Sequence, residues 1–274
     1  MADVANAGRG LGLAHFSVIT VGPAELVSLA AQAGFARVGF RLIPPFEGAP
    51  YYPLRVGSRQ TRDLLEQVTG EGIQVYDIEA VVIDEAFNPL ALEPMLETGQ
   101  FLGAQRLTVS GDDRDTSRLT ANFSALCEIA ARYGMAVDME NMGWRTVATF
   151  EQAVSIVSAS AAPNAGVLVD ALHFFRNGAE ASALSKDENR IRSVQLCDAR
   201  GLHPALPDDM IREARAGRFA PGEGDLPLQT LLEALPRDAV LSVEVPQVDG
   251  STPEDHVRHL FKATRTLLET HAIG

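Results

Sequence analysis

The chain has 274 residues, of which 46% are hydrophobic and 22% charged, an ordinary composition for a globular protein with a large core. Its 23 basic and 36 acidic residues give a net charge of −13 without a basic stripe, which argues against nucleic acid as a partner. Two isolated cysteines, Cys127 and Cys197, exclude a disulfide framework or a thiolate metal site and are expected to be buried. No basic segment followed by an apolar run and no membrane-spanning run are visible, so we expect a cytoplasmic protein without membrane contact.

Short β-branched segments alternate with longer segments of helical periodicity along the chain. The segments predicted to be strands are 13–19, 36–43, 73–83, 105–110, 135–140, 166–170, 191–197 and 239–245. This alternation implies parallel strands joined by right-handed crossovers. An open doubly wound sheet usually has fewer strands, so eight evenly spaced units favour closure.

The segments between the strands carry helix signals. One apolar stripe follows the fourth strand and ends at Gly134, a residue suited to a left-handed C-cap; it comprises Leu119, Phe123, Leu126, Ala130 and Tyr133. The last helix is predicted to begin with Thr252 as N-cap, Pro253 in the first position and Asp255 as the capping partner.

The predicted fold is therefore of the α/β class, one (β/α)8 TIM-barrel domain over residues 1–274 with a flexible tail at 1–10. About 250 residues is a typical length for this fold. Two connections, 44–57 and 198–225, are longer than a barrel needs. Because they follow strands, we expect them at the catalytic face, at the carboxyl ends of the strands.

Polar residues close four successive predicted strands: Glu140, Asp170, Gln195 and Glu244. Neighbouring strand ends of a closed barrel bring such side chains together. Three carboxylates and an amide in a partly buried site require a cation, and an all-oxygen set suits Mg2+ or Mn2+. Capping of each strand end or binding of a loop amide is a fair alternative for any single residue, but a weaker one for all four.

Several segments resemble the xylose-isomerase-like sugar isomerases and epimerases, among them ketose 3-epimerases, hydroxypyruvate isomerase and inosose dehydratase, over nearly the whole chain. They are VDMEN (137–141), LVDALHFFRNG (168–178), VQLCDA (194–199), RFAPGEGDLP (218–227) and SVEV (242–245). The resemblance implies one divalent metal ion, Mn2+ or Mg2+ with Co2+ or Zn2+ also compatible, on Glu140, Asp170, Gln195 and Glu244.

The same resemblance implies substrate contacts for His173 and Arg218, and a homo-oligomer, dimer or tetramer. Many members have His-x-Lys-Asp where this chain reads Gln195-Leu196-Cys197-Asp198. A substrate contact from that lysine is therefore not expected here, and Gln195 is similar to the hydroxypyruvate isomerase and inosose dehydratase branches.

A metal ion beside carboxylates suits proton abstraction next to a carbonyl, through an enediolate. Glu140 and Glu244 are assigned as the catalytic pair, one removing the proton and the other returning it. The predicted function is a metal-dependent isomerase or epimerase of a keto sugar or related polyol. The alternative is a metal-dependent lyase or dehydratase that eliminates a β-hydroxyl or β-alkoxyl group from a keto sugar or glycoside.

The first three strands supply further residues for the pocket. His15 is either a hydrogen-bonded barrel histidine or a substrate contact, and the sequence leaves both open. Arg41 near a strand end is expected to pair with Glu79 or with a substrate oxygen, which makes both of them substrate-binding candidates.

Two other groups of residues have a plainer interpretation. Phe46, Tyr51 and Tyr52 are expected to form an aromatic lid, suited to a partly apolar substrate, or simply a packed loop. His256 and His259 on the last helix resemble a metal pair but are expected to form a solvated face.

Two other functions fit less well. An endonuclease of the abasic-site type shares the barrel, but it normally needs several metals and many histidines, and this chain has 6. A non-enzymatic binding barrel would require a degenerate metal site. A small-molecule substrate is therefore the expected partner.

Overall fold

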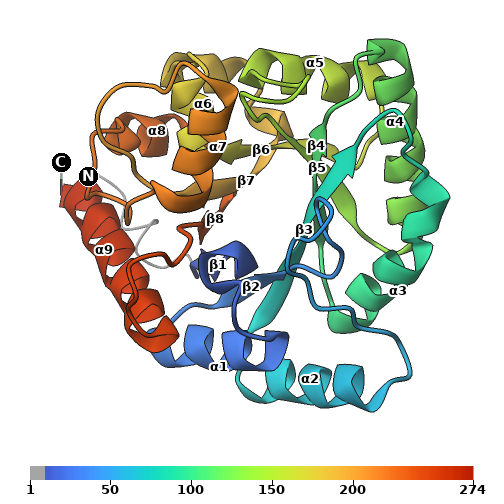
Figure 1. Ribbon diagram of the computed structural model, residues 1–274, viewed down its shortest axis with the longest axis horizontal. Helices are drawn as coiled ribbons and strands as arrows, with labels where there is room; N and C mark the ends of the chain where they lie inside the picture. The colour runs from blue at the N-terminus through green and yellow to red at the C-terminus, as the bar shows by residue number, and fades with distance from the viewer. Residues whose placement is uncertain (1–9, 274) are drawn as a thin grey trace.

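The protein, described here by a computed structural model over residues 10–273, forms a closed barrel of eight parallel strands in chain order (Figure 1). The strands are β1 (Gly12–Leu13), β2 (Arg37–Phe40), β3 (Gln74–Ile83), β4 (Arg106–Gly111), β5 (Ala136–Glu140), β6 (Ala165–Asp170), β7 (Ile191–Leu196) and β8 (Val240–Val243). Each strand pairs with the next, and β8 pairs with β1. The predicted TIM barrel is confirmed, while the predicted tail, apart from Gly10, falls outside the described residues.

Helices surround the barrel, and α9 lies beside α1, which closes the outer ring (Figure 1). The α-helices are α1 (Pro23–Ala33), α2 (Arg59–Gly70), α3 (Glu93–Leu102), α4 (Thr116–Arg132), α5 (Phe150–Ser160), α6 (Ala171–Arg176), α7 (Pro207–Ala216), α8 (Leu228–Ala234) and α9 (Pro253–Ile273). Short 3-10 helices are η2 (His15–Val18), η3 (Pro89–Leu92), η4 (Ala181–Lys186) and η5 (Glu188–Arg190). None of the described helices is both long and apolar enough to cross a membrane.

The predicted helix ends are confirmed where they rested on capping chemistry. Helix α4 is followed by Gly134 at a φ of 72°, a left-handed conformation that glycine adopts without strain. Asp255 donates its backbone N–H to the Thr252 hydroxyl (3.1 Å), and that hydroxyl donates to the Asp255 carboxylate (2.8 Å). Both cysteines are buried, as expected.

The first strand is much shorter than the predicted 13–19. It ends at Leu13 and the chain turns into η2, because side chains satisfy the backbone that a longer ladder would have used. The Glu79 carboxylate accepts the N–H groups of His15 (2.5 Å) and Phe16 (3.2 Å). Ser17 donates its hydroxyl to the carbonyl of Val243 (3.1 Å). Strand 13–19 was therefore a wrong prediction beyond Leu13.

Polar side chains occupy the barrel interior in two layers, as the two-residue period of a strand dictates. Asp138 lies two residues before Glu140 on β5, and Ser193 lies two residues before Gln195 on β7. The deeper layer contains a set we call the interior cluster: Tyr76, Arg106, Asp138 and Ser193. The outer layer opens at the carboxyl ends of the strands and forms the site below.

Candidate active site

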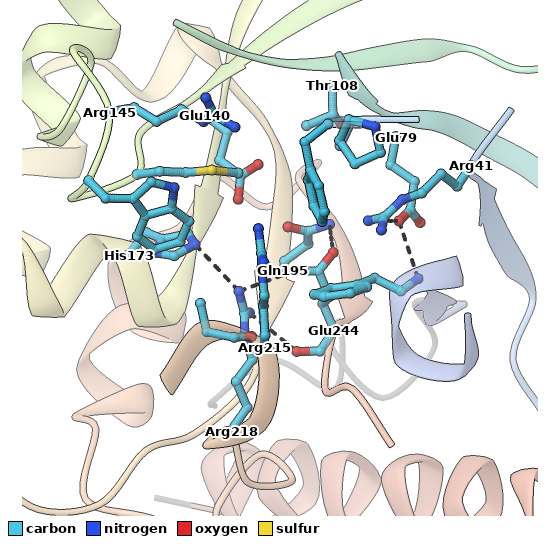
Figure 2. Close-up of a pocket in the computed structure, with 17 residues that line it drawn as sticks. Arg41, Glu79, Thr108, Glu140, Arg145, His173, Gln195, Arg215, Arg218 and Glu244 are labelled. Atoms are coloured by element: carbon cyan, nitrogen blue, oxygen red, sulfur yellow. Dashed lines mark hydrogen bonds and ion pairs between the residues drawn. The ribbon is translucent and has the colours of Figure 1, made fainter. Parts of the chain in front are cut away.

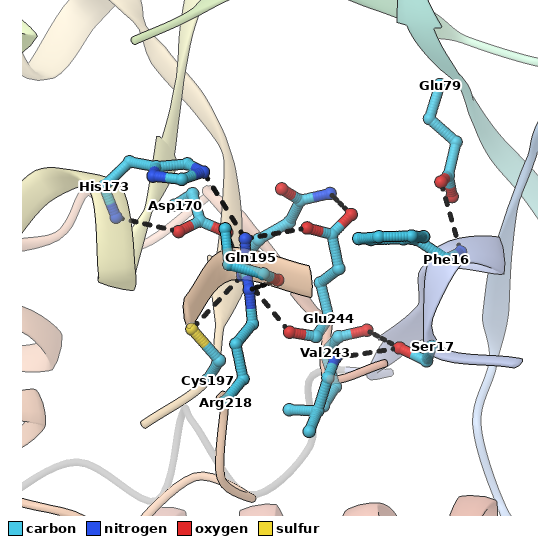
Figure 3. Close-up of polar contacts among 12 residues, drawn as sticks. Phe16, Ser17, Glu79, Asp170, His173, Gln195, Cys197, Arg218, Val243 and Glu244 are labelled. Atoms are coloured by element: carbon cyan, nitrogen blue, oxygen red, sulfur yellow. Dashed lines mark hydrogen bonds and ion pairs between the residues drawn. The ribbon is translucent and has the colours of Figure 1, made fainter. Parts of the chain in front are cut away.

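The four predicted metal ligands meet at the carboxyl ends of β5 to β8 (Figures 2 and 3). Glu140 and Asp170 are the last residues of their strands, Gln195 is the next-to-last of β7, and Glu244 follows β8 directly. Asp170 and Gln195 are paired across β6 and β7. All four side chains belong to buried residues. We call them the strand-end cluster.

Asp170 is held from two sides. One oxygen accepts the backbone N–H of His173 (3.0 Å) and so caps α6, while the other lies 2.5 Å from Nη1 of Arg218. Burial opposes ionisation most strongly, but the Arg218 guanidinium and the contacts with His173 together lower the pKa of Asp170. Asp170 is therefore fixed as a carboxylate with a defined orientation.

Arg218 also reaches Glu244: its Nη2 lies 3.3 Å from the Glu244 carboxylate. The resemblance assigned Arg218 to the substrate, and the structure places it in the pocket wall against two predicted metal ligands. The loop after β7 positions it through an antiparallel bridge between Asp198 and Phe219, with N–H to O distances of 2.8 and 2.9 Å.

Gln195 leaves an acceptor without a partner. Its amide nitrogen donates to Glu244 (3.1 Å), whereas its Oε1 is buried and has no hydrogen bond. A buried acceptor without a partner is costly, and a cation is one natural partner for it. The carboxylates of Glu140, Asp170 and Glu244 against the single guanidinium of Arg218 leave two negative charges when all are ionised. The residues present therefore fit a divalent cation.

Burial and neighbouring charge shift the pKa of both proposed catalytic glutamates. Burial, then the charges of Asp170 and Glu244, raise the pKa of Glu140 well above its usual value. Burial, then the charge of Glu79, raise the pKa of Glu244 to about 7, although Arg218 opposes this. Such clustered carboxyl groups hold protons near neutral pH, which is what a general acid–base pair requires.

His173 lies closer to the strand-end cluster than its predicted role implied. One ligand atom from each of Glu140, Asp170 and His173 lies within 4.8 Å of the others. Burial lowers the pKa of His173 to about 4, so the ring is neutral at pH 7 and its nitrogen can act as a ligand. The ring also makes an edge-to-face contact with Trp144, with centroids 5.1 Å apart. A metal set of two carboxylates and one imidazole is thus a second arrangement that these residues allow.

The opposite wall contains an ion pair between Arg41 and Glu79, with an N–O distance of 3.1 Å. Pairing with Glu79 was one of the two expectations for Arg41. Both residues line the pocket.

His15 lies behind this wall and does not line the pocket. Its Nε2 lies 2.9 Å from the carbonyl of Val21, and its Nδ1 accepts the N–H of Arg41 (3.2 Å). Burial lowers its pKa, which keeps the ring neutral for these two opposite roles. Of the two roles that the sequence left open for His15, these contacts support the hydrogen-bonded barrel histidine.

Both long loops contribute to the pocket, as expected for βα connections. Phe46 lines it, whereas Tyr52 stacks on His15 (5.0 Å between centroids) and donates to the carbonyl of Ile19 (2.9 Å). Tyr51 is exposed and outside the lining. The predicted aromatic lid is therefore reduced to Phe46, joined by Phe16 and Trp144 from other segments.

The two histidines of the last helix lie in different environments. His259 is exposed and pairs with Glu223 (2.9 Å), as a solvated face requires. His256 is buried against the carbonyl of Val245 (2.8 Å), and burial lowers its pKa. The predicted solvated face was wrong for His256, because the carbonyl of Val245, just after β8, lies against the first turn of α9.

Sequence reasoning missed several residues of the pocket, including Thr108, Trp144, Arg145 and Arg215. Trp144 and Arg145 follow the strand-end Glu140 by four and five residues, and the only tryptophan of the chain so near a candidate ligand was a usable signal. Arg215 had none, because it looks like any polar residue of α7.

Curated relatives match only part of this chain. An inosose isomerase of Bacillus subtilis is 30% identical over 150 residues, 52% of this chain and 52% of that protein. The inosose isomerase of Bacillus velezensis is 29% identical over 157 residues, 54% of each. A 3-dehydroshikimate dehydratase of Pseudomonas putida is 28% identical over 120 residues, 43% of this chain and 18% of that protein. The matched region spans about half the length of the inosose isomerases.

Solved structures share the fold over almost the whole chain. A crystal structure of the IOLI protein with a binding zinc atom superposes with a TM-score of 0.79 at 22% identity, over 96% of this chain and 99% of that one. An L-ribulose 3-epimerase gives a TM-score of 0.71 at 14% identity, over 95% of both chains. The sequence profile of the xylose isomerase-like TIM barrel family matches residues 27–267, and the chain belongs to that family.

Proposed function

We propose that the protein is a divalent-metal-dependent isomerase or epimerase acting on a keto sugar or related polyol. The observation that carries this proposal is the buried Oε1 of Gln195, which lacks a partner amid the carboxylates of the strand-end cluster. The inosose isomerases among the relatives and the L-ribulose 3-epimerase among the similar folds support the reaction class.

The ion would be held by Glu140, Asp170, Gln195 and Glu244, with His173 as an additional ligand. When bound, it supplies Lewis-acid stabilisation of negative charge that develops on a substrate oxygen. The zinc in the IOLI structure supports a divalent ion as a class, and Mn2+ or Mg2+ remain our preferred ions from the oxygen-rich set.

Glu140 and Glu244 move the proton. In the view of Figure 2 their carboxyl groups lie on opposite sides of Gln195. One of them removes a proton from the carbon next to the carbonyl, and the other returns it to the opposite face or to the neighbouring carbon. The pKa of Glu244, raised to about 7, suits a group that both accepts and releases a proton at neutral pH.

A dehydratase is the second candidate, because a 3-dehydroshikimate dehydratase is among the relatives. The first step is shared: a carboxylate removes the proton next to the carbonyl. The reactions differ afterwards, since a dehydratase expels a β-hydroxyl group with the second carboxyl group as the proton donor.

Solvent-deuterium exchange tests the proposed function. The wild-type protein with added Mn2+ is expected to incorporate deuterium beside the carbonyl of at least one ketose in a broad panel, measured by NMR. Glu244→Gln is expected to lower this exchange by about 100-fold or more, because general acid–base catalysis contributes at least that much. A wild type that forms an unsaturated product, detected by its ultraviolet absorbance, would favour the dehydratase.

Metal analysis gives a readout that does not depend on activity. The purified wild type is expected to bind a divalent ion, and Asp170→Ala to lose it. Glu223→Gln is the matched control, because Glu223 lies outside the pocket and pairs with His259. A wild type that binds no divalent ion, or an Asp170→Ala variant that still binds one, contradicts the proposed metal site.

A further inference from the structure

Apart from Arg218, three arginines line the pocket: Arg41, Arg145 and Arg215. They come from three separate segments, since Arg41 follows β2, Arg145 lies in the loop after β5 and Arg215 is on α7. Figure 2 shows Arg215 between Arg145 and Arg41. The proposed proton transfer uses none of them.

Two of these arginines have donors without acceptors. Arg41 pairs with Glu79 (3.1 Å) and Arg145 with Asp112 (2.7 Å), yet the Nε of each is buried and has no hydrogen-bond partner. In the described part of the chain, the buried side-chain atoms without a partner are these two and Oε1 of Gln195. All three belong to residues of the same pocket. Unmet donors of this kind are expensive unless a ligand supplies the acceptor.

Arg215 carries a charge that no described residue neutralises. Its side chain forms neither an ion pair nor a hydrogen bond within residues 10–270, and its guanidinium lies over the ring of Phe46, 4.3 Å from the centroid. Burial, followed by the charges of Arg145 and Arg41, lowers its pKa. Arg41 and Arg145 each have a carboxylate partner, so Arg215 is the one of these three guanidinium groups without an anion among the described residues.

The arginines and the strand-end cluster divide the pocket by charge. The carboxylates of the strand-end cluster lie at the strand ends, where Arg218 forms ion pairs with Asp170 and Glu244. The other three arginines come from loops and from α7, and two of them have carboxylate partners of their own. A neutral sugar in this part of the pocket would leave the charge of Arg215 without a counter-ion.

We propose that the substrate carries a carboxylate or phosphate group, bound by Arg145 and Arg215 with Arg41 beside them. Both groups match the planar fork of a guanidinium, which can donate two parallel hydrogen bonds to either. This inference rests on the proposed function and narrows its substrate to an anionic keto sugar, a keto acid or a sugar phosphate.

Trp144 is the only tryptophan of the chain and lines this pocket, so its fluorescence is a probe of binding here. Quenching of its fluorescence is to be followed with fructose, fructose 6-phosphate and fructuronate, which share one carbon skeleton, and with inorganic phosphate. We expect the phosphate or the carboxylate compound to bind at least about 10-fold more tightly than fructose, the preferred one identifying the anion.

Arg215→Gln and Arg145→Gln are each expected to remove most of that ~10-fold preference while leaving fructose binding unchanged. Arg212→Gln is the matched control, since Arg212 lies on the same helix, is exposed and pairs with Asp209. It should leave the preference unchanged. The proposal is overturned when fructose binds as tightly as both anionic compounds, when neither anionic compound nor phosphate binds, or when Arg215→Gln weakens all ligands equally.

Failure of this inference is separable from failure of the proposed function. The binding experiment needs no turnover and is repeated with Glu244→Gln, in which proton transfer is lost. A preference for anionic ligands without deuterium exchange supports the anion site and counts against the proposed reaction. Deuterium exchange on a neutral ketose without a preference for anionic ligands supports the proposed reaction and counts against the anion site.

Discussion

The interior cluster and the strand-end cluster lie one layer apart inside the same barrel, yet they differ in how completely their polar groups are paired. In the interior cluster, Arg106 donates to both oxygens of Asp138, and Ser193 donates to the same carboxylate (2.6 Å). The Tyr76 hydroxyl lies 3.1 Å from that of Ser193.

The polar groups of the strand-end cluster are not all paired in this way. Gln195 has an unpartnered Oε1, and the side chain of Glu140 makes no hydrogen bond or ion pair within the described residues. Burial raises the pKa of Glu140, whereas the pKa of Arg106 is raised by the charge of Asp138 in spite of burial. A fully paired buried network stabilises the fold, while an incomplete one is complementary to something that binds.

Asp138→Asn is expected to have the largest effect on stability. It leaves the Arg106 guanidinium half-paired in the barrel, which should lower the free energy of unfolding by about 3–5 kcal/mol. Denaturation in urea measures this loss. Asp63→Asn, which breaks the exposed pair with Arg59, is the control and should cost less than about 1 kcal/mol. A loss no larger than the control would mean that the interior cluster contributes little to the fold.

Ser193→Ala should have a smaller effect on the same cluster. It removes the hydrogen bond to the charged Asp138 and the contact with the Tyr76 hydroxyl, and it leaves the bidentate contact of Arg106 in place, at a cost of about 1.5–2 kcal/mol. Ser185→Ala, on an exposed 3-10 turn, should be nearly neutral. Thermal and urea unfolding of the two variants compare them directly, and an equal loss in both would contradict the assignment.

Glu140→Gln should have the smallest effect on stability, although it replaces a buried carboxyl group on the same strand as Asp138. No described hydrogen bond or ion pair is lost, so metal-free unfolding should change by less than about 1 kcal/mol. The variant should nevertheless lose stabilisation by added divalent ion, which reaches about 2.7 kcal/mol in wild type at 100 times the dissociation constant. A loss of stability as large as that of Asp138→Asn would remove the distinction between the clusters.

The sequence by itself determined the barrel and the strand-end cluster. Eight β-branched segments alternating with helical ones establish the order of the strands, and a closed parallel barrel makes consecutive strand ends neighbours. That rule was sufficient to bring Glu140, Asp170, Gln195 and Glu244 together, because the position of a residue at the end of a strand is visible in the chain.

Only the tertiary structure decided what surrounds this cluster. In the structure, Arg218 pairs with Asp170 and Glu244, and His15 lies behind the wall of the pocket. Arg145 and Arg215 line the pocket together with Arg41. These residues lie on loops, on a short turn and on a peripheral helix, where no period fixes the direction of a side chain. Their positions depend on how the connecting segments fold back over the strand ends, which is governed by contacts distant in sequence.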